Sequence, residues 1–463
     1  MPSPPRYGST SARAEQDRNG SEGVVITTAN PERTRPGLSG LLRRVPRPRL
    51  SRLPSLRTLR EVRSSSTRTG WTRTLKDALD RPLTTYYLLL GATALLLTIG
   101  LIMVLSASSV SSYRATGDSY TIVKRQVMWV ALGIPCAFIA SRVSIKWVRG
   151  LAYPAFSISL ILLGLTALVG VEVNGNTNWL ALGPVQIQPS EIAKLSLVIW
   201  ASHIYANKER RLGNLHQMLV PVVPGMILAT GLVVIGRDLG TALIFFALLV
   251  AMLWVVGAPA RLFVMSFLVV SVLALALAAT NPVRMARISS FTNPLREDIY
   301  HSTGWQPAHG LYAMSSGGIF GEGIGASQQK WGSLPEAHTD FIFAVLGEEL
   351  GLVGTLLVIG LFLVIAYAGL RVARETTQPF VRYCTFGIMV WLIGQMMINV
   401  GMVLAMLPVI GIPLPLVSYG GSSLLPTLAA LGLVIGFARR EPAAARALAQ
   451  RRRARSAGLS ARG

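Results

Sequence analysis

The residues best placed to do chemistry lie where a polar loop meets a long apolar segment. The stretch from Trp331 to Gly354, WGSLPEAHTDFIFAVLGEELGLVG, carries His338 and Asp340 at that junction. A carboxylate at the edge of an apolar segment of membrane length is costly unless it is paired, solvated or used, so Asp340 marks a candidate site. It could act as a general base or hold a metal ion. The structural alternative is a carboxylate that interacts with the helix dipole.

A second polar stretch interrupts the apolar sequence at Asn174 to Lys194, NGNTNWLALGPVQIQPSEIAK. Pro189, with an acid two residues later, is typical of a helix start. Glu191 and Lys194 are spaced to lie on one helix face, where they can pair. The pair could be structural, or Glu191 could orient a lysine that binds an anion.

Two further polar stretches carry candidate binding residues. Gly236 to Thr241, GRDLGT, holds Arg237 and Asp238, which form either a local ion pair or part of the same cavity. Irregular backbone at membrane depth survives only where it lines a cavity or packs within protein. The stretch from Pro413 to Ser423, PLPLVSYGGSS, combines small residues with hydroxyls: Ser418, Gly420, Gly421 and Ser422. Together the four stretches predict an outward-facing polar cavity.

Other chemical motifs are not evident. The run from Gly317 to Gly325, GGIFGEGIG, lacks the lysine and hydroxyl of a phosphate-binding loop, so no nucleotide is expected. The five histidines show no metal-ligand spacing, and Cys136 and Cys384 fall in apolar segments without a disulfide pattern. These residues alone do not separate an enzyme from a transporter.

The composition predicts an all-α polytopic membrane protein. The 463 residues are 51% hydrophobic and 14% charged, with a mean hydropathy of +0.49, whereas ordinary soluble domains are about a quarter charged. Many apolar runs approach the roughly 20 residues needed to cross a bilayer. About ten transmembrane helices are expected, near 84–106, 123–141, 148–170, 190–206, 216–235, 239–257, 260–279, 341–370, 380–407 and 421–438.

Charge sets the expected orientation and domain limits. Residues 1–82 hold 17 Lys/Arg and 7 Asp/Glu and are expected to be a disordered, basic cytoplasmic tail. Residues 439–463 are a second basic cytoplasmic tail, and 83–438 form the transmembrane domain. Basic tails that flank membrane spans mark the cytoplasmic face and its anionic lipids rather than nucleic acid. The cytoplasmic membrane is therefore the expected location, with both termini inside.

Two features are expected on the outer side. The loop 280–340, between the seventh and eighth spans, is rich in aromatic residues and predicted to fold over the outer mouth of the bundle, with the run Gly310–Ile319 along the membrane surface. Lys124 and Arg125 fall at the outer end of the second span. They could snorkel to the headgroups or contact an anionic, lipid-linked substrate.

These stretches resemble the SEDS family (shape, elongation, division and sporulation proteins) over roughly residues 84–438. The resemblance rests on QPSEIAK at 188–194, DLGT at 238–241, LPEAHTDFIFAVLGEELGLVG at 334–354 and LVSYGGSSLL at 416–425. The 310–354 block resembles the division-type members more than the rod-shape members. A division-type member would work at the septum.

The resemblance implies a glycosyltransferase that polymerises lipid II, the undecaprenyl-pyrophosphate-linked disaccharide peptide, at the outer face of the cytoplasmic membrane. The family's essential aspartate corresponds to Asp340, and its functional residues in the other blocks to Glu191, Lys194 and Trp179. Asn178 stands where the family commonly has arginine, and Arg237 where many members have proline.

The resemblance also implies partners: a class B penicillin-binding protein, which is the septal transpeptidase, and other membrane proteins of the division machinery. A divalent cation, Mg²⁺ or Mn²⁺, could assist at the pyrophosphate, although the sequence assigns no ligands to it. The alternatives are a lipid II flippase, a structural anchor that recruits the synthase, and the elongation-type polymerase of the same family.

Overall fold

The computed structural model describes residues 81, 83–173, 176–183, 185–279, 285, 294–447 and 449–450. The chain divides into two compact units, 1–68 and 69–463, and every described residue belongs to the second. The predicted N-terminal tail apart from residue 81 and the end of the C-terminal tail lie outside the described residues, as do 280–284 and 286–293 of the outer loop. The predictions for these segments therefore remain predictions.

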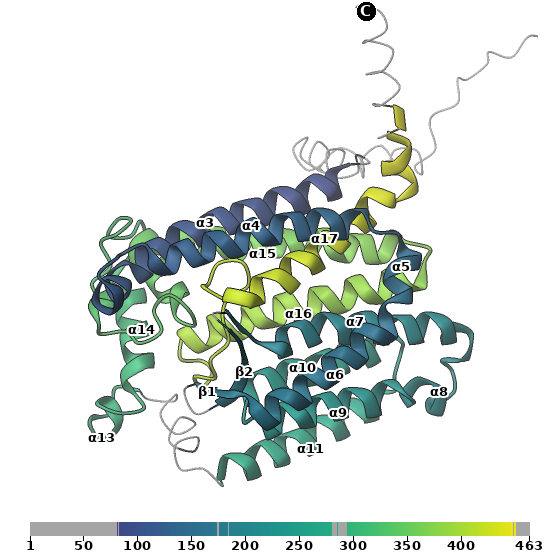
Figure 1. Cartoon of the computed structure of the whole chain (residues 1–463), viewed down its shortest axis with the longest axis horizontal. Coiled ribbons are helices and arrows are strands. Elements are labelled where there is room, and N and C mark those ends of the chain that lie inside the picture. Colours follow the sequence, from purple (N-terminus) through teal and green to yellow (C-terminus); the bar gives the residue numbers. More distant parts are fainter. Residues whose placement is uncertain are drawn as a thin grey trace, which may run out of the picture. The chain divides into compact units, whose positions relative to one another are not determined.

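The second unit is helical, which confirms the predicted fold class. Most of its longer helices run in roughly the same or opposite directions (Figure 1). In chain order the helices are α3 (Thr84–Thr116), α4 (Thr121–Arg142), α5 (Ile145–Gly150), α6 (Ala152–Val169), α7 (Pro189–Lys208), η1 (Glu209–Arg211), α8 (Leu215–Leu219), α9 (Val222–Ile235), α10 (Leu239–Val255), α11 (Ala260–Ala279), α13 (Glu297–Tyr300), α14 (Trp305–Ser316), η2 (Gln329–Trp331), α15 (Ile342–Glu375), α16 (Pro379–Val403), η3 (Gly421–Ser423) and α17 (Leu424–Arg440).

Seven helical segments of the described chain are long and apolar enough to cross a membrane. Two further apolar helices, α10 and the first part of α11, are shorter than this criterion requires. Helix α7 matches the predicted fourth span in position but buries Glu191 and Lys194 in its first turns. Helices thus occupy all ten predicted positions, and crossing by α7, α10 and α11 remains a prediction.

A small antiparallel sheet, which the sequence analysis does not predict, occupies the polar stretch before α7. Its strands are β1 (Val171–Val173), β2 (Asn176–Leu182) and β3 (Val185–Ile187), in the order β1-β2-β3. Trp179 pairs with Val171, and Leu180 pairs with Ile187. β1 and β3 have three residues each, and the seven residues of β2, NTNWLAL, do not alternate between polar and apolar, so periodicity does not reveal the strands. They carry Asn178 and Trp179 and lead the chain directly into α7.

Close helix contacts form where glycine removes a side chain. On α17, a Cβ at Gly432 would lie 2.3 Å from the Ala137 carbonyl oxygen of α4, and one at Gly436 would lie 2.5 Å from that of Ser141. Two glycines four residues apart thus let the helix backbones touch, a common device in membrane bundles. This contact holds the second half of α17 against α4.

The polar segments gather at one end of the helices. In Figure 1 the strands and helices α13 and α14 lie at the left end, whereas α5 and α8 lie at the right end. The right end includes the basic residues Lys146 and Arg149 of α5. Of the predicted outer loop, the structure describes 285 and 294–340, and the latter contain α13, α14 and η2. That this loop covers the outer mouth of the bundle stays a prediction.

Candidate active site

Asp340 lies in the turn immediately before α15, held by a buried amide from another helix. Asn399 of α16 donates hydrogen bonds from Nδ2 to the carbonyl oxygens of Asp340 and Ile412, both at 2.7 Å. On the other side, a Cβ at Gly411 would lie 3.4 Å from Asp340 Oδ2, and Gly411 has a φ of 71°. One amide therefore fixes the Asp340 backbone and the loop 404–420 in the same place.

The surroundings of Asp340 suit a proton acceptor near neutral pH. The carboxyl group is partly buried. Displacement of water, together with the negative charges of Glu336 and Asp238, raises the pKa of Asp340 to about 7. A general base works best when its pKa lies near the operating pH. Geometry and electrostatics thus both favour Asp340 as the reactive group.

Asp238 is a cap rather than a free carboxylate. As the N-cap of α10 it accepts hydrogen bonds from the Thr241 backbone N–H and hydroxyl, both at 2.9 Å, and from Asn178 Nδ2 at 3.0 Å. Beside Asp238, α10 packs closely against the loop 404–420. A Cβ at Gly240 would lie 2.6 Å from the Ile410 carbonyl oxygen. Asn178, at the position where the family commonly has arginine, therefore helps to hold the Asp238 carboxylate in place.

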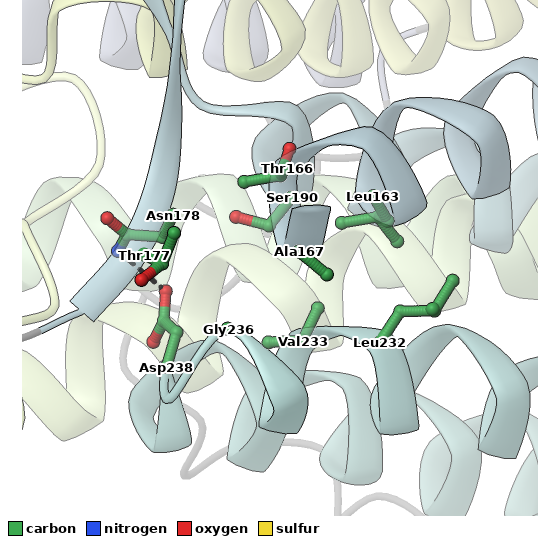
Figure 2. Close-up of a pocket in the computed structure, with 10 residues that line it drawn as sticks. All are labelled: Leu163, Thr166, Ala167, Thr177, Asn178, Ser190, Leu232, Val233, Gly236 and Asp238. Atoms are coloured by element: carbon green, nitrogen blue, oxygen red, sulfur yellow. Dashed lines mark hydrogen bonds between the residues drawn. The ribbon is translucent and has the colours of Figure 1, made fainter. Parts of the chain in front are cut away.

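A small cavity lies behind this cap, where Asn178 and Asp238 point toward one another (Figure 2). Its volume is about 20 Å³, which suffices for about one water molecule. It cannot hold a sugar, so it belongs to the support of Asp238 and is not the substrate site. Its lining is Leu163, Thr166, Ala167, Thr177, Asn178, Ser190, Leu232, Val233, Gly236 and Asp238.

The loop 404–420 passes directly beside the turn that holds Asp340. The Tyr419 N–H donates to the carbonyl oxygen of His338 at 2.9 Å, and the two rings lie 5.8 Å apart. Ser418 Oγ accepts from the Leu414 N–H at 2.8 Å, which closes the loop on itself. Burial lowers the pKa of His338 and outweighs the opposing charge of Glu336. His338 is therefore a neutral neighbour of the site.

The glycine–serine run after this loop connects it to α7. Ser422 Oγ accepts a hydrogen bond from the Gln188 N–H, one residue before α7, at 3.1 Å. Gly420 precedes η3 and Gly421 begins it with a φ of 52°, a backbone geometry that favours glycine. A Cβ at Gly421 would lie 3.7 Å from the Trp129 ring nitrogen. These three predicted binding residues therefore shape the loop that borders Asp340.

The remaining predicted residues, three cations and a tryptophan, lie in different surroundings. Arg125 of α4 lies beside the Tyr419 hydroxyl, and burial raises the pKa of Tyr419 although Arg125 opposes this. Lys124 instead pairs with Asp118 at 2.7 Å in an exposed position. Arg237 precedes Asp238 with a φ of 63°. Trp179 is partly buried in β2.

The predicted Glu191–Lys194 pair forms, and it is buried. Lys194 Nζ donates to Glu191 Oε1 at 2.7 Å, and the Lys194 and Glu191 side chains are 1% and 3% exposed respectively. Lys194 also donates to Gln395 Oε1 at 3.4 Å, and Gln395 Nε2 donates to the Pro413 carbonyl oxygen at 3.0 Å. The pair thus underlies the loop 404–420 and does not open to solvent in this conformation.

Two amides that hold the site were missed by the sequence analysis. Gln395 and Asn399 lie four residues apart on α16, both buried, and both donate to carbonyl groups of the loop 404–420. Amides repeated at that spacing within an apolar helix share one face. That pattern was available in the sequence and would have pointed to a polar face of α16.

Comparison with known proteins identifies what this chain is similar to. Residues 87–442 match the FtsW/RodA/SpoVE family, described as "Cell cycle protein". A probable peptidoglycan glycosyltransferase FtsW of Mycobacterium bovis is 40% identical over 372 residues, which cover 80% of this chain and 71% of the relative. Stage V sporulation protein E of Bacillus subtilis is 36% identical over 357 residues, 76% of this chain and 96% of the relative.

Solved structures show the same architecture. A chain from a peptidoglycan synthase complex, described under the words "Structural coordination of polymerization and crosslinking", superposes with a TM-score of 0.62 at 29% identity, over 76% of this chain and 97% of that one. The rod-shape-determining protein RodA of Thermus thermophilus superposes with a TM-score of 0.57 at 30% identity, over 77% and 97% respectively.

Proposed function

The chain belongs to the FtsW/RodA/SpoVE family of cell cycle proteins and is a peptidoglycan glycosyltransferase, and we propose that Asp340 is the base with which it polymerises lipid II. The observation that supports this most strongly is the raised pKa of a carboxyl group held between α15, α16 and the loop 404–420. Purified protein with labelled lipid II tests the proposal. Glycan chains are expected, and transbilayer movement or no reaction would contradict it.

The proposed reaction needs one proton acceptor. The 4-hydroxyl of the acceptor sugar attacks the anomeric carbon of the donor, the new glycosidic bond forms, and the bond to the lipid pyrophosphate breaks. Asp340 takes the hydroxyl proton, and the pyrophosphate leaves with the electron pair. Because pyrophosphate is a good leaving group, a second carboxyl group of the kind used by glycosidases is not required.

The leaving pyrophosphate needs positive charge. Arg125, beside Tyr419, is the predicted cation that supports this role best, because it borders the loop next to Asp340. A Mg²⁺ or Mn²⁺ ion remains a proposal: Mg²⁺ is usually held by one or two carboxylates together with substrate phosphates. The described residues contain no group of three His, Cys, Asp or Glu side chains that could hold a metal. Asp238 is occupied by Thr241 and Asn178, and Asp340 is assigned the role of base, so neither carboxylate is assigned to such an ion.

Polymerisation should depend on pH through the state of Asp340. Its pKa is raised to about 7, and only the ionised form can accept a proton. The initial rate at saturating lipid II should therefore rise as pH increases through about 7 and level off above it. Rates from pH 5.5 to 8.5 check this. A rate that is flat across this window would contradict the assignment of the base.

We further propose that the end of the helices containing α14 is extracellular. The basic residues of α5 and η1 support this, because positive residues stay in the cytoplasm. A cysteine at Ser302, in the outer loop, should react with a membrane-impermeant maleimide added to whole cells. Labelling only after the cells are permeabilised would reverse the orientation.

The partner that fits this proposal is a class B penicillin-binding protein. Support comes from the similar solved chain, which belongs to a peptidoglycan synthase complex that coordinates polymerization and crosslinking. Other division proteins and the anionic inner leaflet are further proposed partners. The flippase alternative is not favoured, since the curated relatives are named glycosyltransferases.

The division septum is the proposed place of action. The FtsW relatives support it, although the structural neighbours include RodA. Depletion should give filamentous or branched cells without septa, and a fluorescent fusion should mark the division site. Deletion of residues 2–70 should leave polymerisation in vitro intact. Depleted cells that round up while still forming septa would indicate the elongation-type polymerase.

A further inference from the structure

An apolar loop tip protrudes from the segment between α14 and η2. It consists of Ile319, Phe320 and Ile324, which are 61%, 81% and 64% exposed. Large apolar side chains that cluster at a surface mark a contact with a partner or a membrane. The loop tip plays no part in the site around Asp340, so it requires a separate explanation.

Much of the backbone of this loop is already hydrogen-bonded, which lowers the cost of entering an apolar medium. Helix α15 breaks at Gly351, which has φ 65° and ψ −162°. The loop replaces the helical bonds that the break removes. Leu352 N donates to Gly318 O (3.0 Å), Val353 N to Ile319 O (3.1 Å), Glu322 N to Glu348 O (2.9 Å) and Gly323 N to Glu349 O (3.1 Å).

Two independent counts put this break at the edge of the hydrocarbon layer. Arg371 lies near the basic end of helix α15. About 20 residues separate Arg371 from Gly351, which is about 30 Å of helix at 1.5 Å per residue and matches the thickness of the hydrocarbon layer. Helix α3 starts at Thr84, and Ser106 follows after about 33 Å of helix. Ser106 Oγ donates to Glu349 Oε1 at 2.5 Å. Both helices therefore reach the far boundary of a bilayer at the same level.

The loop tip continues an exposed apolar face of α15. Leu352, Val353, Leu356 and Leu357 are all more than half exposed, as expected for side chains that face lipid in a membrane-crossing helix. Ile319 is hydrogen-bonded to the backbone of Val353, so the loop tip lies next to the upper end of this face. The exposed Glu322, which lies between Phe320 and Ile324 in the sequence, can remain among the polar headgroups.

We propose that the loop tip inserts into the outer leaflet and contacts phospholipid acyl chains beside α15. The occupant is lipid rather than a protein because the surface is continuous with the lipid-facing side of a spanning helix and lies at its boundary level. The loop is bonded to the half of α15 that begins just after Asp340. Insertion therefore sets the depth of Asp340 relative to the membrane, a consequence that rests on the proposed function.

Spin-label accessibility tests the insertion directly and needs no enzyme activity. The full chain carrying Cys136→Ala and Cys384→Ala receives one cysteine, at Phe320, Leu356 or Ser302, and is reconstituted in nanodiscs of phosphatidylethanolamine and phosphatidylglycerol. Leu356 is the control for lipid and Ser302 the control for water. A spin label at position 320 should collide more often with oxygen than with a water-soluble nickel chelate, as a label at 356 should. A label at 302 should show the reverse.

A label at 320 that behaves like the one at 302 would overturn the proposal. So would a label that becomes protected only when a penicillin-binding protein is added, because the surface would then be a protein interface. If the cysteine-free chain does not fold, p-benzoylphenylalanine at position 320 of the otherwise unchanged chain provides the same test. Irradiation should give phospholipid adducts by mass spectrometry, and their absence, with adducts present at 356, would refute insertion.

Discussion

Asp340→Asn should abolish polymerisation of lipid II while leaving the protein folded. Asparagine keeps the size of the side chain and can still accept a hydrogen bond, but it cannot take a proton. Because a general base contributes roughly 100- to 10,000-fold to a rate, the loss should be at least about 100-fold. The Asn399 contact is to the backbone carbonyl of Asp340 and survives the substitution. Glycan chain length and yield from purified protein measure the effect.

Glu336→Gln is the matched control for this substitution. Glu336 raises the pKa of Asp340 by its negative charge, so its neutralisation should lower that pKa. The pH–rate curve should then shift to lower pH, whereas the plateau rate above pH 8 should stay within a few-fold of the parent. Near-normal glycan synthesis by Asp340→Asn, at any pH, would show that Asp340 is only a helix-end carboxylate.

The sequence predicts those parts of the site where a charge interrupts an apolar run. Asp340 and the Glu191–Lys194 pair stand out for that reason, and the structure places the pair at 2.7 Å as its spacing predicts. The helix start at Pro189 is likewise predicted from local chemistry and confirmed. In these places a short stretch of residues carries enough information, because the cost of a charge in an apolar setting is local.

What the sequence does not predict depends on contacts between distant segments. The sequence analysis does not single out Lys330, yet it lies buried and pairs with Glu349 at 2.9 Å. That pair exists only because the loop enters the break in α15 at Gly351. The path of the loop 404–420 is also set from afar, by Gln395 and Asn399. No periodicity marks such a loop, so only the folded chain reveals that it borders Asp340.

The buried ion pair at the start of α7 should give the second large effect. Lys194→Ala removes the partner of Glu191, whose Oε2 atom already lacks a hydrogen bond within the described structure. An unpaired buried charge costs roughly 3–5 kcal/mol, so thermal stability in detergent should fall together with polymerisation. Lys194→Arg keeps the charge and should retain more of both. These single variants alone do not separate the fold from the chemistry.

The double variant Glu191→Gln/Lys194→Met separates the two roles. It leaves no unpaired charge and keeps similar volumes, so the unfolding temperature should return close to that of the parent. Polymerisation should nevertheless stay at least about tenfold lower than in the parent, which corresponds to about 1.4 kcal/mol. The reason is that Lys194 is proposed to supply a positive charge beneath the loop 404–420, which borders Asp340 and the pyrophosphate. A double variant that is both stable and fully active would show that the pair serves neither stability nor substrate. One that remains unstable would assign the pair to the fold alone, through Gln395 and the Pro413 carbonyl.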